Sequence, residues 1–127
     1  MGFDLKDIGD EKRIIFVNFW NWRPTVEVLG RAGLFDEKRL AELHEQFSHT
    51  LVTKDEARAI AHYLREKVLP SLPHTGRILL DGSVTTTPND GTFYKAPEDS
   101  HKNYGATHFW LEKFASFCET CDGFVLN

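Results

Sequence analysis

Cysteine, long apolar runs and clustered positive charge are all scarce in this 127-residue chain. Its two cysteines are too few for the disulfide framework of a small secreted domain. No apolar run approaches the length of about 18 residues that a transmembrane helix needs. The 15 lysines and arginines are scattered among 19 acidic residues, whereas a nucleic-acid backbone requires a concentrated basic patch. We therefore expect neither a membrane nor a nucleic acid as a partner.

Targeting and catalytic motifs are missing as well. The start of the chain, Met1 to Asp7, has neither the basic residues nor the apolar run of a secretory signal, so we expect a cytoplasmic protein. The P-loop, the dinucleotide-binding glycine motif and the nucleophile motif of common hydrolases do not occur. We expect a protein without enzymatic activity and without a cofactor. A small enzyme is the alternative, because a sequence does not show which carboxylates converge in space.

Aromatic residues are abundant, at 13 % of the chain, with ten phenylalanines and three tryptophans. A chain of this length forms one domain that buries roughly two thirds of its unfolded surface. We therefore expect a single globular domain over residues 1–127 with rings in its core. The densest stretch is Phe16–Pro24. It has two interpretations: core packing, or a partly exposed surface around Trp22 and Arg23 with the composition of an interaction hot spot.

The spacing of apolar residues and of capping residues predicts about four helices. The clearest begins at a capping box formed by Thr53 and Glu56 and continues to the proline at position 70. A second begins at Asn21, which can accept a hydrogen bond as the N-cap, and ends at Gly33. The other two helices are expected from Asp36 to about residue 47 and from Thr107 to Gly123.

Short alternating segments at the two ends of the chain predict strands. Residues 2–8 alternate apolar and polar side chains, Phe124–Leu126 forms the last segment, and Ile14 to about Trp20 is expected to be extended. We expect the N- and C-terminal strands to pair, which gives an α+β fold with about four helices and a small sheet. Residues 81–105 are rich in turn-forming dipeptides and are expected to form a long loop, a kind of segment that often carries function.

Four features of the chain stand out together: the start Met1–Asp4, the cluster Trp20–Pro24, the helix Thr53–Leu64, and the ending Trp110–Cys118 followed by Gly123 and Phe124. In these features the chain resembles a group of small bacterial proteins of unknown function, whose members begin Met-Gly-x-Asp. Asp122 stands where that group has a glycine. The resemblance supports the α+β fold and implies no established activity. Some small bacterial proteins of this size are immunity proteins that neutralise a toxin, so the resemblance suggests a protein of that type.

The acidic net charge of −4, the long polar loop and the missing catalytic motifs predict a non-catalytic module that binds another protein. The loop supplies acidic groups for the contact and two tyrosines as anchors, and the Trp-rich stretch adds two further candidates. The expected contact residues are Asp81, Asp90, Tyr94, Glu98, Asp99, Tyr104, Trp22 and Arg23.

Two cysteines and two histidines raise the alternative of a zinc or redox site. Cys118 and Cys121 form a C-x-x-C pair, and the spacing of His44 and His49 falls within the range of zinc-finger histidines. The cysteines, however, lie at the C-terminal end of the last predicted helix, where the helix dipole disfavours a thiolate. Cysteines with this spacing on an apolar stripe are usually core residues. We therefore expect both cysteines in the core, no metal, and the remaining histidines at the surface.

Overall fold

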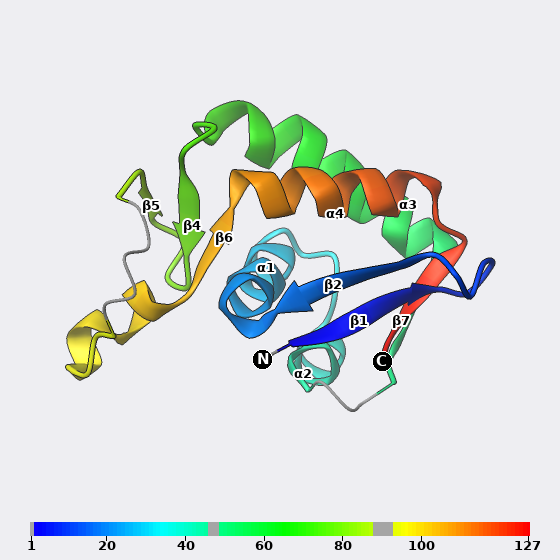
Figure 1. The fold of residues 1–127 in the computed structure, drawn as a ribbon, viewed down its shortest axis with the longest axis horizontal. Coiled ribbons are helices and arrows are strands. Elements are labelled where there is room, and N and C mark those ends of the chain that lie inside the picture. Colours follow the sequence, from blue (N-terminus) through cyan, green and yellow to red (C-terminus); the bar gives the residue numbers. More distant parts are fainter. Residues whose placement is uncertain (1, 46–48, 88–92) are drawn as a thin grey trace.

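The computed structural model describes residues 2–45, 49–87 and 93–127. This described part contains two antiparallel sheets and four α-helices, so the predicted α+β fold is confirmed (Figure 1). The helical segments in chain order are α1 (Phe19–Arg31), α2 (Glu37–His44), α3 (Lys54–Tyr63), the π-helical turn η1 (Leu64–Val68), the 3-10 turn η2 (Leu69–Ser71), the 3-10 helix η3 (Pro97–Asn103) and α4 (His108–Thr120). None of the helices in the described residues combines the length and the apolar character that crossing a bilayer requires.

The larger sheet joins the two ends of the chain. Leu5 in the first strand lies opposite Leu126 in the last, which confirms the predicted pairing of the N- and C-terminal strands. The smaller sheet lies with η3 at the other end of the molecule (Figure 1). The strand order is β2 (Ile14–Asn18), β1 (Gly2–Asp7), β7 (Gly123–Leu126), β3 (Leu51–Thr53) in the larger sheet and β5 (Val84–Thr85), β4 (Arg77–Leu79), β6 (Gly105–Thr107) in the smaller one.

Aromatic rings form the centre of the core. Trp22 and Phe114 are fully buried, and their ring centroids lie 5.7 Å apart with 79° between the planes. The two buried indoles both have acceptors for their N–H groups: Trp22 donates to the Leu43 carbonyl at 2.7 Å, and Trp110 donates to the Thr25 hydroxyl at 2.9 Å. The rings therefore supply both apolar area and directional bonds that set their positions.

The first helix begins earlier than predicted. Asn18, rather than Asn21, is the N-cap, because its side-chain oxygen accepts a hydrogen bond from the Asn21 backbone N–H at 2.9 Å. With this start, Trp22 points into the core and Trp20, which is 40 % exposed, lies at the surface. The end of α1 agrees with the prediction, since the helix stops just before Gly33, whose φ of 74° is a left-handed conformation that favours glycine.

The capping box of α3 is confirmed, but the end of this helix differs from the prediction. Thr53 accepts from the Glu56 N–H at 3.2 Å, and Glu56 accepts from the Thr53 N–H at 3.0 Å. Beyond α3 the Leu69 N–H bonds back to the Leu64 carbonyl in the pattern of a π-helix. The proline at position 70 lacks an N–H and cannot continue the helical bonds, so the segment ends in the 3-10 turn η2.

The predicted caps of α2 and α4 are also confirmed. Asp36 and Thr107 accept hydrogen bonds from backbone N–H groups one turn into their helices, at 2.8 Å and 3.1 Å. The second helix ends at His44, earlier than predicted. Residues 46–48, where the predicted end falls, lie outside the described residues.

The predicted long loop over residues 81–105 contains ordered elements. Both β5 and η3 fall inside it, and its last residue begins β6. The buried Asn103 ties this segment together, because its side chain accepts from the Tyr94 N–H at 2.7 Å and donates to the Tyr94 carbonyl at 2.9 Å. Residues 88–92, which include the expected contact residue Asp90, lie outside the described residues.

Candidate functional site

The start of α1 and the end of η3 meet at the surface, where they form a patch of three rings and one guanidinium. Phe19, Trp20 and Arg23 lie on one side of the first turns of α1, and Tyr104 lies between η3 and β6. We call these four residues the aromatic–arginine patch. Together they line a cavity of about 260 Å³.

A tilted ring contact and cation–π contacts hold the aromatic–arginine patch together. The ring centroids of Trp20 and Tyr104 lie 5.0 Å apart, with 31° between the planes. The Arg23 guanidinium carbon lies 5.4 Å from the Tyr104 ring centroid and 5.9 Å from the Phe19 centroid, within the range of cation–π attraction. Arg23 makes no ion pair or hydrogen bond with any described residue. Its N–H donors are therefore available to an acceptor from outside the chain.

Bonds behind the patch fix its position. The Asn21 side-chain oxygen accepts a hydrogen bond from the Thr107 N–H at 3.0 Å, which joins α1 to the end of β6. The Trp110 indole donates to the Thr25 hydroxyl, which adds a bond between α1 and α4. The patch side chains thus stand on a base that is already ordered, which lowers the entropy cost of a contact.

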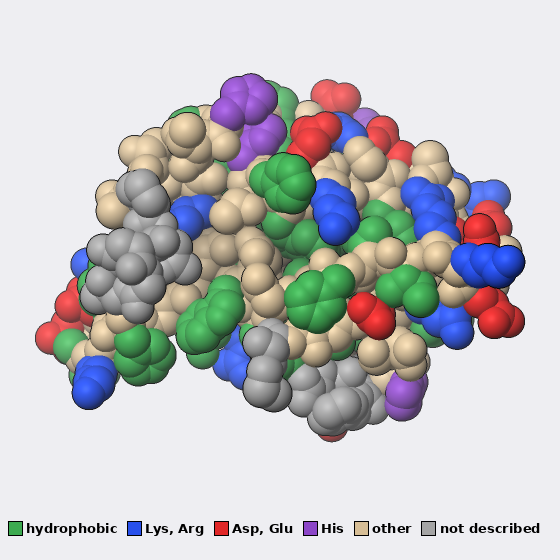
Figure 2. Space-filling model, in the orientation of Figure 1, with side chains coloured by type: hydrophobic (Ala, Val, Ile, Leu, Met, Phe, Trp, Pro, Cys, Tyr) green, Lys and Arg blue, Asp and Glu red, His purple; other side chains and the backbone are tan. Residues whose placement is uncertain are grey.

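Exposed hydrophobic side chains also occur elsewhere on the surface. Phe16, Phe93 and Phe109 are 56 %, 60 % and 79 % exposed. Figure 2 shows hydrophobic side chains at several points of one face, with polar atoms between them. The aromatic–arginine patch differs because the rings of Trp20 and Tyr104 contact each other and the Arg23 guanidinium lies over the Tyr104 ring.

The structure divides the expected contact residues among different places. Arg23 and Tyr104 lie together in the patch. Trp22 is fully buried and its indole N–H is bonded within the core, so its placement in a contact surface is corrected: core packing accounts for this residue. Trp20, which was not among the expected contact residues, lies at the surface instead. The residue in the sequence that accounts for this difference is Asn18. Its capping bond fixes where α1 begins, and the start of the helix decides which of the two tryptophans faces the core.

The expected acidic contact residue Asp81 lies in the turn between β4 and β5 and is bonded within the chain. Its carboxylate accepts from the Ser83 N–H at 2.9 Å and the Ser83 hydroxyl at 2.6 Å, and it lies 3.3 Å from His101 Nε2. The hydrogen bonds from Ser83 are the main reason that the pKa of Asp81 is lowered, and His101 adds to the effect. Asp81 is therefore ionised and engaged with its own segment.

Tyr94 and the acids of η3 form a neighbouring group. The Lys102 ammonium lies 3.0 Å from the Asp99 carboxylate and 5.6 Å from the Tyr94 ring centroid, and the hydrogen bond to Asp99 raises the pKa of Lys102. Glu98 is exposed and has no ion-pair partner among the described residues. Because Tyr104 directly follows η3, this group adjoins the aromatic–arginine patch along the chain.

The two cysteines belong to the core. Cys118 and Cys121 are fully buried free thiols, and burial raises the pKa of Cys118 well above its ordinary range, which keeps the thiol protonated and unreactive. His44 lies 3.2 Å from the Glu27 carboxylate, and His49 is exposed. Among the residues that the structure describes, no three His, Cys, Asp or Glu side chains are placed to hold a metal ion. The geometry gives the zinc alternative no support.

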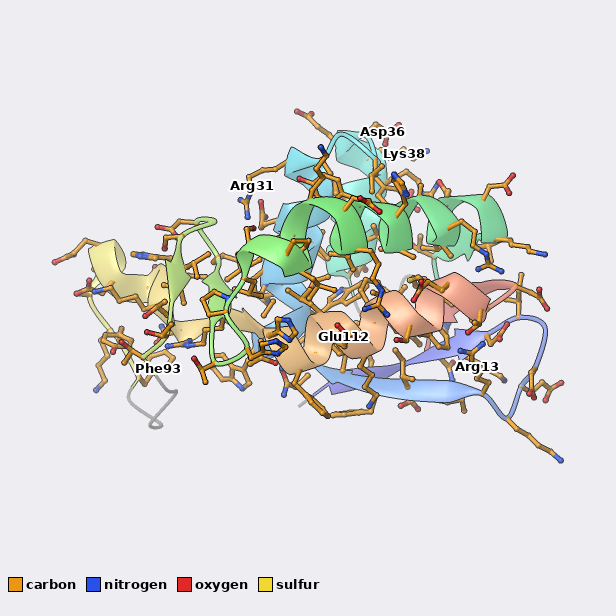
Figure 3. The ribbon with its side chains drawn as sticks, turned by 90° about the horizontal axis from the view of Figure 1, so that it is seen from above. Arg13, Arg31, Asp36, Lys38, Phe93 and Glu112 are labelled. Atoms are coloured by element: carbon orange, nitrogen blue, oxygen red, sulfur yellow. The ribbon has the colours of Figure 1, made fainter. Side chains whose placement is uncertain are left out.

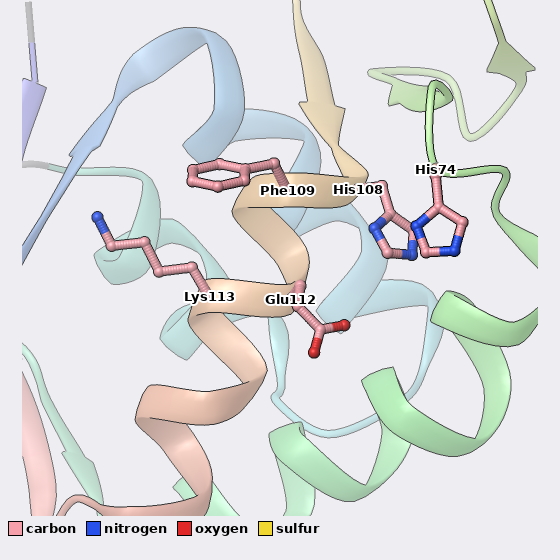
Figure 4. A pocket seen from close by; sticks show the side chains of 5 residues that line it. All are labelled: His74, His108, Phe109, Glu112 and Lys113. Carbon is pink, nitrogen blue, oxygen red and sulfur yellow. The ribbon is translucent and has the colours of Figure 1, made fainter.

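A larger cavity, of about 630 Å³, lies at the start of α4 and is lined by His74, His108, Phe109, Glu112 and Lys113 (Figure 4). The imidazole rings of His74 and His108 lie side by side, with centroids 4.4 Å apart. Phe109 and Lys113 extend to the other side of the helix (Figure 4). The Glu112 carboxylate is bound by Arg65, whose hydrogen bond lowers the pKa of Glu112. The polar groups of this cavity therefore do not converge on one point.

Sequence reasoning treated these two histidines as separate surface residues. They meet because His74 precedes β4, His108 follows β6, and the two strands are antiparallel neighbours. The His108 N–H also donates to the Gly76 carbonyl at 3.1 Å. The two histidines are therefore brought together by the pairing of β4 with β6. Local sequence patterns do not show which strands pair.

Comparison of the chain with protein-family models, with curated proteins and with solved structures finds no match. The functional argument therefore rests on the geometry of this chain.

Proposed function

We propose that the protein is a non-catalytic module that binds another protein through the aromatic–arginine patch. The observation that carries this proposal is the exposed Trp20, in ring contact with Tyr104 beside the guanidinium of Arg23, which has no ion pair with a described residue. Tryptophan, tyrosine and arginine are the residue types that contribute most of the binding energy at protein interfaces. In this patch they lie in contact around a cavity.

The patch fits a partner segment that carries a carboxylate beside an apolar side chain. Arg23 offers a planar set of N–H donors that binds a carboxylate in bidentate fashion. The cavity of about 260 Å³ is below the roughly 300–1,000 Å³ of drug-sized ligand sites, and one apolar side chain of a partner fits a space of this kind. The rings of Trp20 and Tyr104 would cover that side chain.

The acidic residues beside the patch extend the proposed contact. Glu98 and Asp99 lie in η3, which ends directly before Tyr104. At roughly 2 Å of rise per residue in a 3-10 helix, these acids are about 10 Å from Tyr104 along the segment. A partner of the proposed kind presents basic groups at that distance. Together with the net charge of −4, this arrangement fits an immunity-type protein that neutralises a toxin by covering part of its surface.

A pull-down from an extract of the native host tests the proposal. The baits are the wild type, a Trp20→Ala variant and a Leu51→Ala variant; Leu51 is 46 % exposed on β3, outside the patch. We expect a protein that is retained by the wild type and by Leu51→Ala but not by Trp20→Ala. With that partner purified, Trp20→Ala should raise the Kd about 30-fold, which corresponds to the roughly 2 kcal/mol of a hot-spot residue.

A charge reversal adds a second and independent arm. Arg23→Glu should weaken the same partner at least as strongly, because it replaces the carboxylate-binding group with a like charge. Lys38→Glu on α2 makes the same change in net charge outside the patch and should bind as the wild type does. A partner retained equally by all baits would contradict the assignment of the patch, and retention of no protein by the wild type would count against a protein-binding function.

A further inference from the structure

A third cavity, of about 240 Å³, lies between the end of α1, the η1–η2 segment and the β4–β5 hairpin. Its charged lining residues are Arg31 and Lys67, and both are exposed. Figure 3 shows Arg31 at the end of α1, next to the hairpin. Neither cation has an ion pair or hydrogen bond with a described residue, and no acidic side chain belongs to the described lining. This cavity therefore presents positive charge without a counter-charge from the described chain.

Within η1, only the cation that lines the cavity lacks an acidic partner among the described residues. Arg65 lies in the same π-helical turn as Lys67, but its guanidinium is bound by two carboxylates of α4. Asp81, which precedes the hairpin glycine, has its carboxylate directed to His101 at 3.3 Å and does not line the cavity. Arg65 is thus neutralised by the chain itself, whereas Lys67 and Arg31 at the cavity are left for an external anion.

The floor of the cavity is apolar. It is formed by the buried side chains of Val28, Leu72 and Ile78, and the exposed Val84 forms part of the rim. Tyr63 also lines the cavity, and its hydroxyl has no hydrogen-bond partner among the described residues. An apolar floor with a few polar donors is the usual composition of a small-molecule site.

The hairpin approaches Arg31 closely because position 82 is a glycine. Gly82 has a φ of 91°, a left-handed conformation that side chains rarely adopt. A Cβ atom at this position would lie 3.1 Å from the guanidinium carbon of Arg31. The glycine therefore permits both the turn and the position of the guanidinium against the backbone, which keeps Arg31 beside the cavity.

We propose that this cavity binds a small organic anion. Its anionic head, a carboxylate or a phosphate, lies between Arg31 and Lys67, and its apolar body lies on the floor of Val28, Leu72 and Ile78. Because the cavity is smaller than the roughly 300–1,000 Å³ of drug-sized sites, the body is a short alkyl chain or a single ring. This site shares no residue with the aromatic–arginine patch and does not depend on the proposed function.

Titration of ¹⁵N-labelled protein, followed by the amide chemical shifts, tests the site. The probes are hexyl phosphate, hexanoate, inorganic phosphate and hexan-1-ol. We expect hexyl phosphate and hexanoate to shift the amides of residues 28–31, 67–69, 71–72 and 78–84, and the tighter of the two identifies the head group. Hexan-1-ol has no negative charge to pair with Arg31 and Lys67, and inorganic phosphate has no apolar body to contact the floor. Each should therefore bind at least about tenfold more weakly than the preferred probe.

Three variants at the cavity and one outside it keep the test decisive. Arg31→Gln and Lys67→Gln should each raise the Kd of the preferred probe about tenfold, because each removes one charge-assisted bond. Val84→Asp places a carboxylate at the exposed rim, where it competes with the ligand for the cations, and should weaken binding to a similar extent. Lys38→Gln, on α2 and outside both the cavity and the aromatic–arginine patch, should bind the probe as the wild type does.

Several outcomes would overturn the proposal. One is an unchanged Kd in both Arg31→Gln and Lys67→Gln, and another is equal binding of hexan-1-ol and hexanoate. Shifts confined to amides outside the named segments would place binding elsewhere and overturn it too. The amide spectrum of each ligand-free variant verifies its fold, so that lost binding is not confused with unfolding.

Discussion

The two sheets of this protein share one hydrophobic core, to which the smaller sheet contributes Ile78 and Ala106, but they differ in how much of that core surrounds them. Buried rings and aliphatic side chains surround the four-stranded sheet, where Trp22, Phe114 and Phe124 are fully buried. The three-stranded sheet has strands of only two or three residues, and side-chain hydrogen bonds such as those of Asn103 hold the adjoining segment. Burial contributes roughly 25 cal/mol per Å² of apolar surface, whereas one hydrogen bond contributes about 1 kcal/mol net. The region of the larger sheet therefore carries most of the stability.

The aromatic–arginine patch lies at the junction of these two regions. Trp20 and Arg23 belong to the helix whose other side, at Trp22, is buried in the core. Tyr104 belongs to the segment that leads into the smaller sheet. Substitutions in the core should therefore unfold the protein, substitutions in the patch should change binding, and substitutions near the smaller sheet should change local opening.

The largest effect is expected from Trp22→Ala. The substitution removes a fully buried indole and leaves the Leu43 carbonyl without its donor, so the free energy of unfolding should fall by about 3–5 kcal/mol. Urea denaturation followed by circular dichroism measures this change. Trp20→Ala removes the same ring from the exposed side of the helix and should cost less than about 1 kcal/mol. Equal losses in the two variants would contradict the assignment of one tryptophan to the core and the other to the surface.

A smaller loss is expected from Asp7→Ala, which tests a polar link inside the region of the larger sheet. One oxygen of this buried carboxylate accepts from the Gly9 and Asp122 N–H groups at 2.9 Å and 3.0 Å, and the other lies 3.6 Å from Arg13. Without these acceptors the free energy of unfolding should fall by about 2 kcal/mol, measured by the same denaturation. Asp7→Asn keeps the accepting oxygen and should recover about half of that loss or more. If Asp7→Asn is as unstable as Asp7→Ala, the charge opposite Arg13 is the dominant contribution.

Caps were predictable from sequence where the bonds are local. Thr53 and Glu56 satisfy each other's backbone N–H groups within one turn, so the pattern of two residues was sufficient. The start of α1 was not predictable in this way, because Asn18 and Asn21 are equally good caps as residue types. The burial of Trp22, which depends on side chains from other elements, decides between them.

The candidate sites were only partly predictable, because they depend on contacts between distant segments. Arg23 and Tyr104 were found as separate candidates, but their contact requires β6 to pack against α1. The cavity of Arg31 and Lys67 forms where the β4–β5 hairpin meets the turn after α3. Apolar residues keep a helical spacing through that turn, so its change from α- to π-helical bonding leaves no mark in the sequence pattern.

Asn103→Ala should have a mainly local effect and thereby sharpen the contrast between the two regions. It removes both hydrogen bonds to the Tyr94 backbone, so we expect a loss of about 1 kcal/mol in the free energy of unfolding. Amide hydrogen exchange should accelerate at Tyr94 and across η3, while the amides of β1 and β7 keep their relative protection. If amide exchange in β1 and β7 accelerates as much as it does in η3, the two regions open as one unit.

Asn103→Asp serves as the matched control for this substitution. It keeps an oxygen that can accept from the Tyr94 N–H but has no N–H to donate to the Tyr94 carbonyl. We expect the exchange rate of the Tyr94 amide in Asn103→Asp to lie between those of the wild type and Asn103→Ala. An exchange rate equal to that of Asn103→Ala would assign the effect to the lost donor alone.

The smallest effect is expected from Glu56→Gln, which removes the charge of the partly exposed ion pair between Glu56 and Arg39 in the region of the larger sheet. Burial alone would raise the pKa of Glu56, but the hydrogen bonds from Arg39 and from the Thr53 N–H outweigh it and lower the pKa. A lowered pKa in the folded state means that the ionised carboxylate stabilises the fold above the ordinary glutamate pKa. That contribution is lost as the pH falls through the folded-state value. Because the pair with Arg39 is partly exposed, it is worth only about 0.5 kcal/mol at pH 7.

Urea denaturation of the wild type and Glu56→Gln at a series of pH values checks this expectation. The difference in the free energy of unfolding should be present at pH 7 and should shrink toward zero between about pH 5 and about pH 3, as Glu56 becomes protonated and resembles the neutral glutamine. Glu11→Gln, at an exposed position without an ion-pair partner among the described residues, controls for the change in net charge. A difference that persists at pH 3 would assign the effect to the geometry of the capping box, because only the charge of Glu56 disappears over this range.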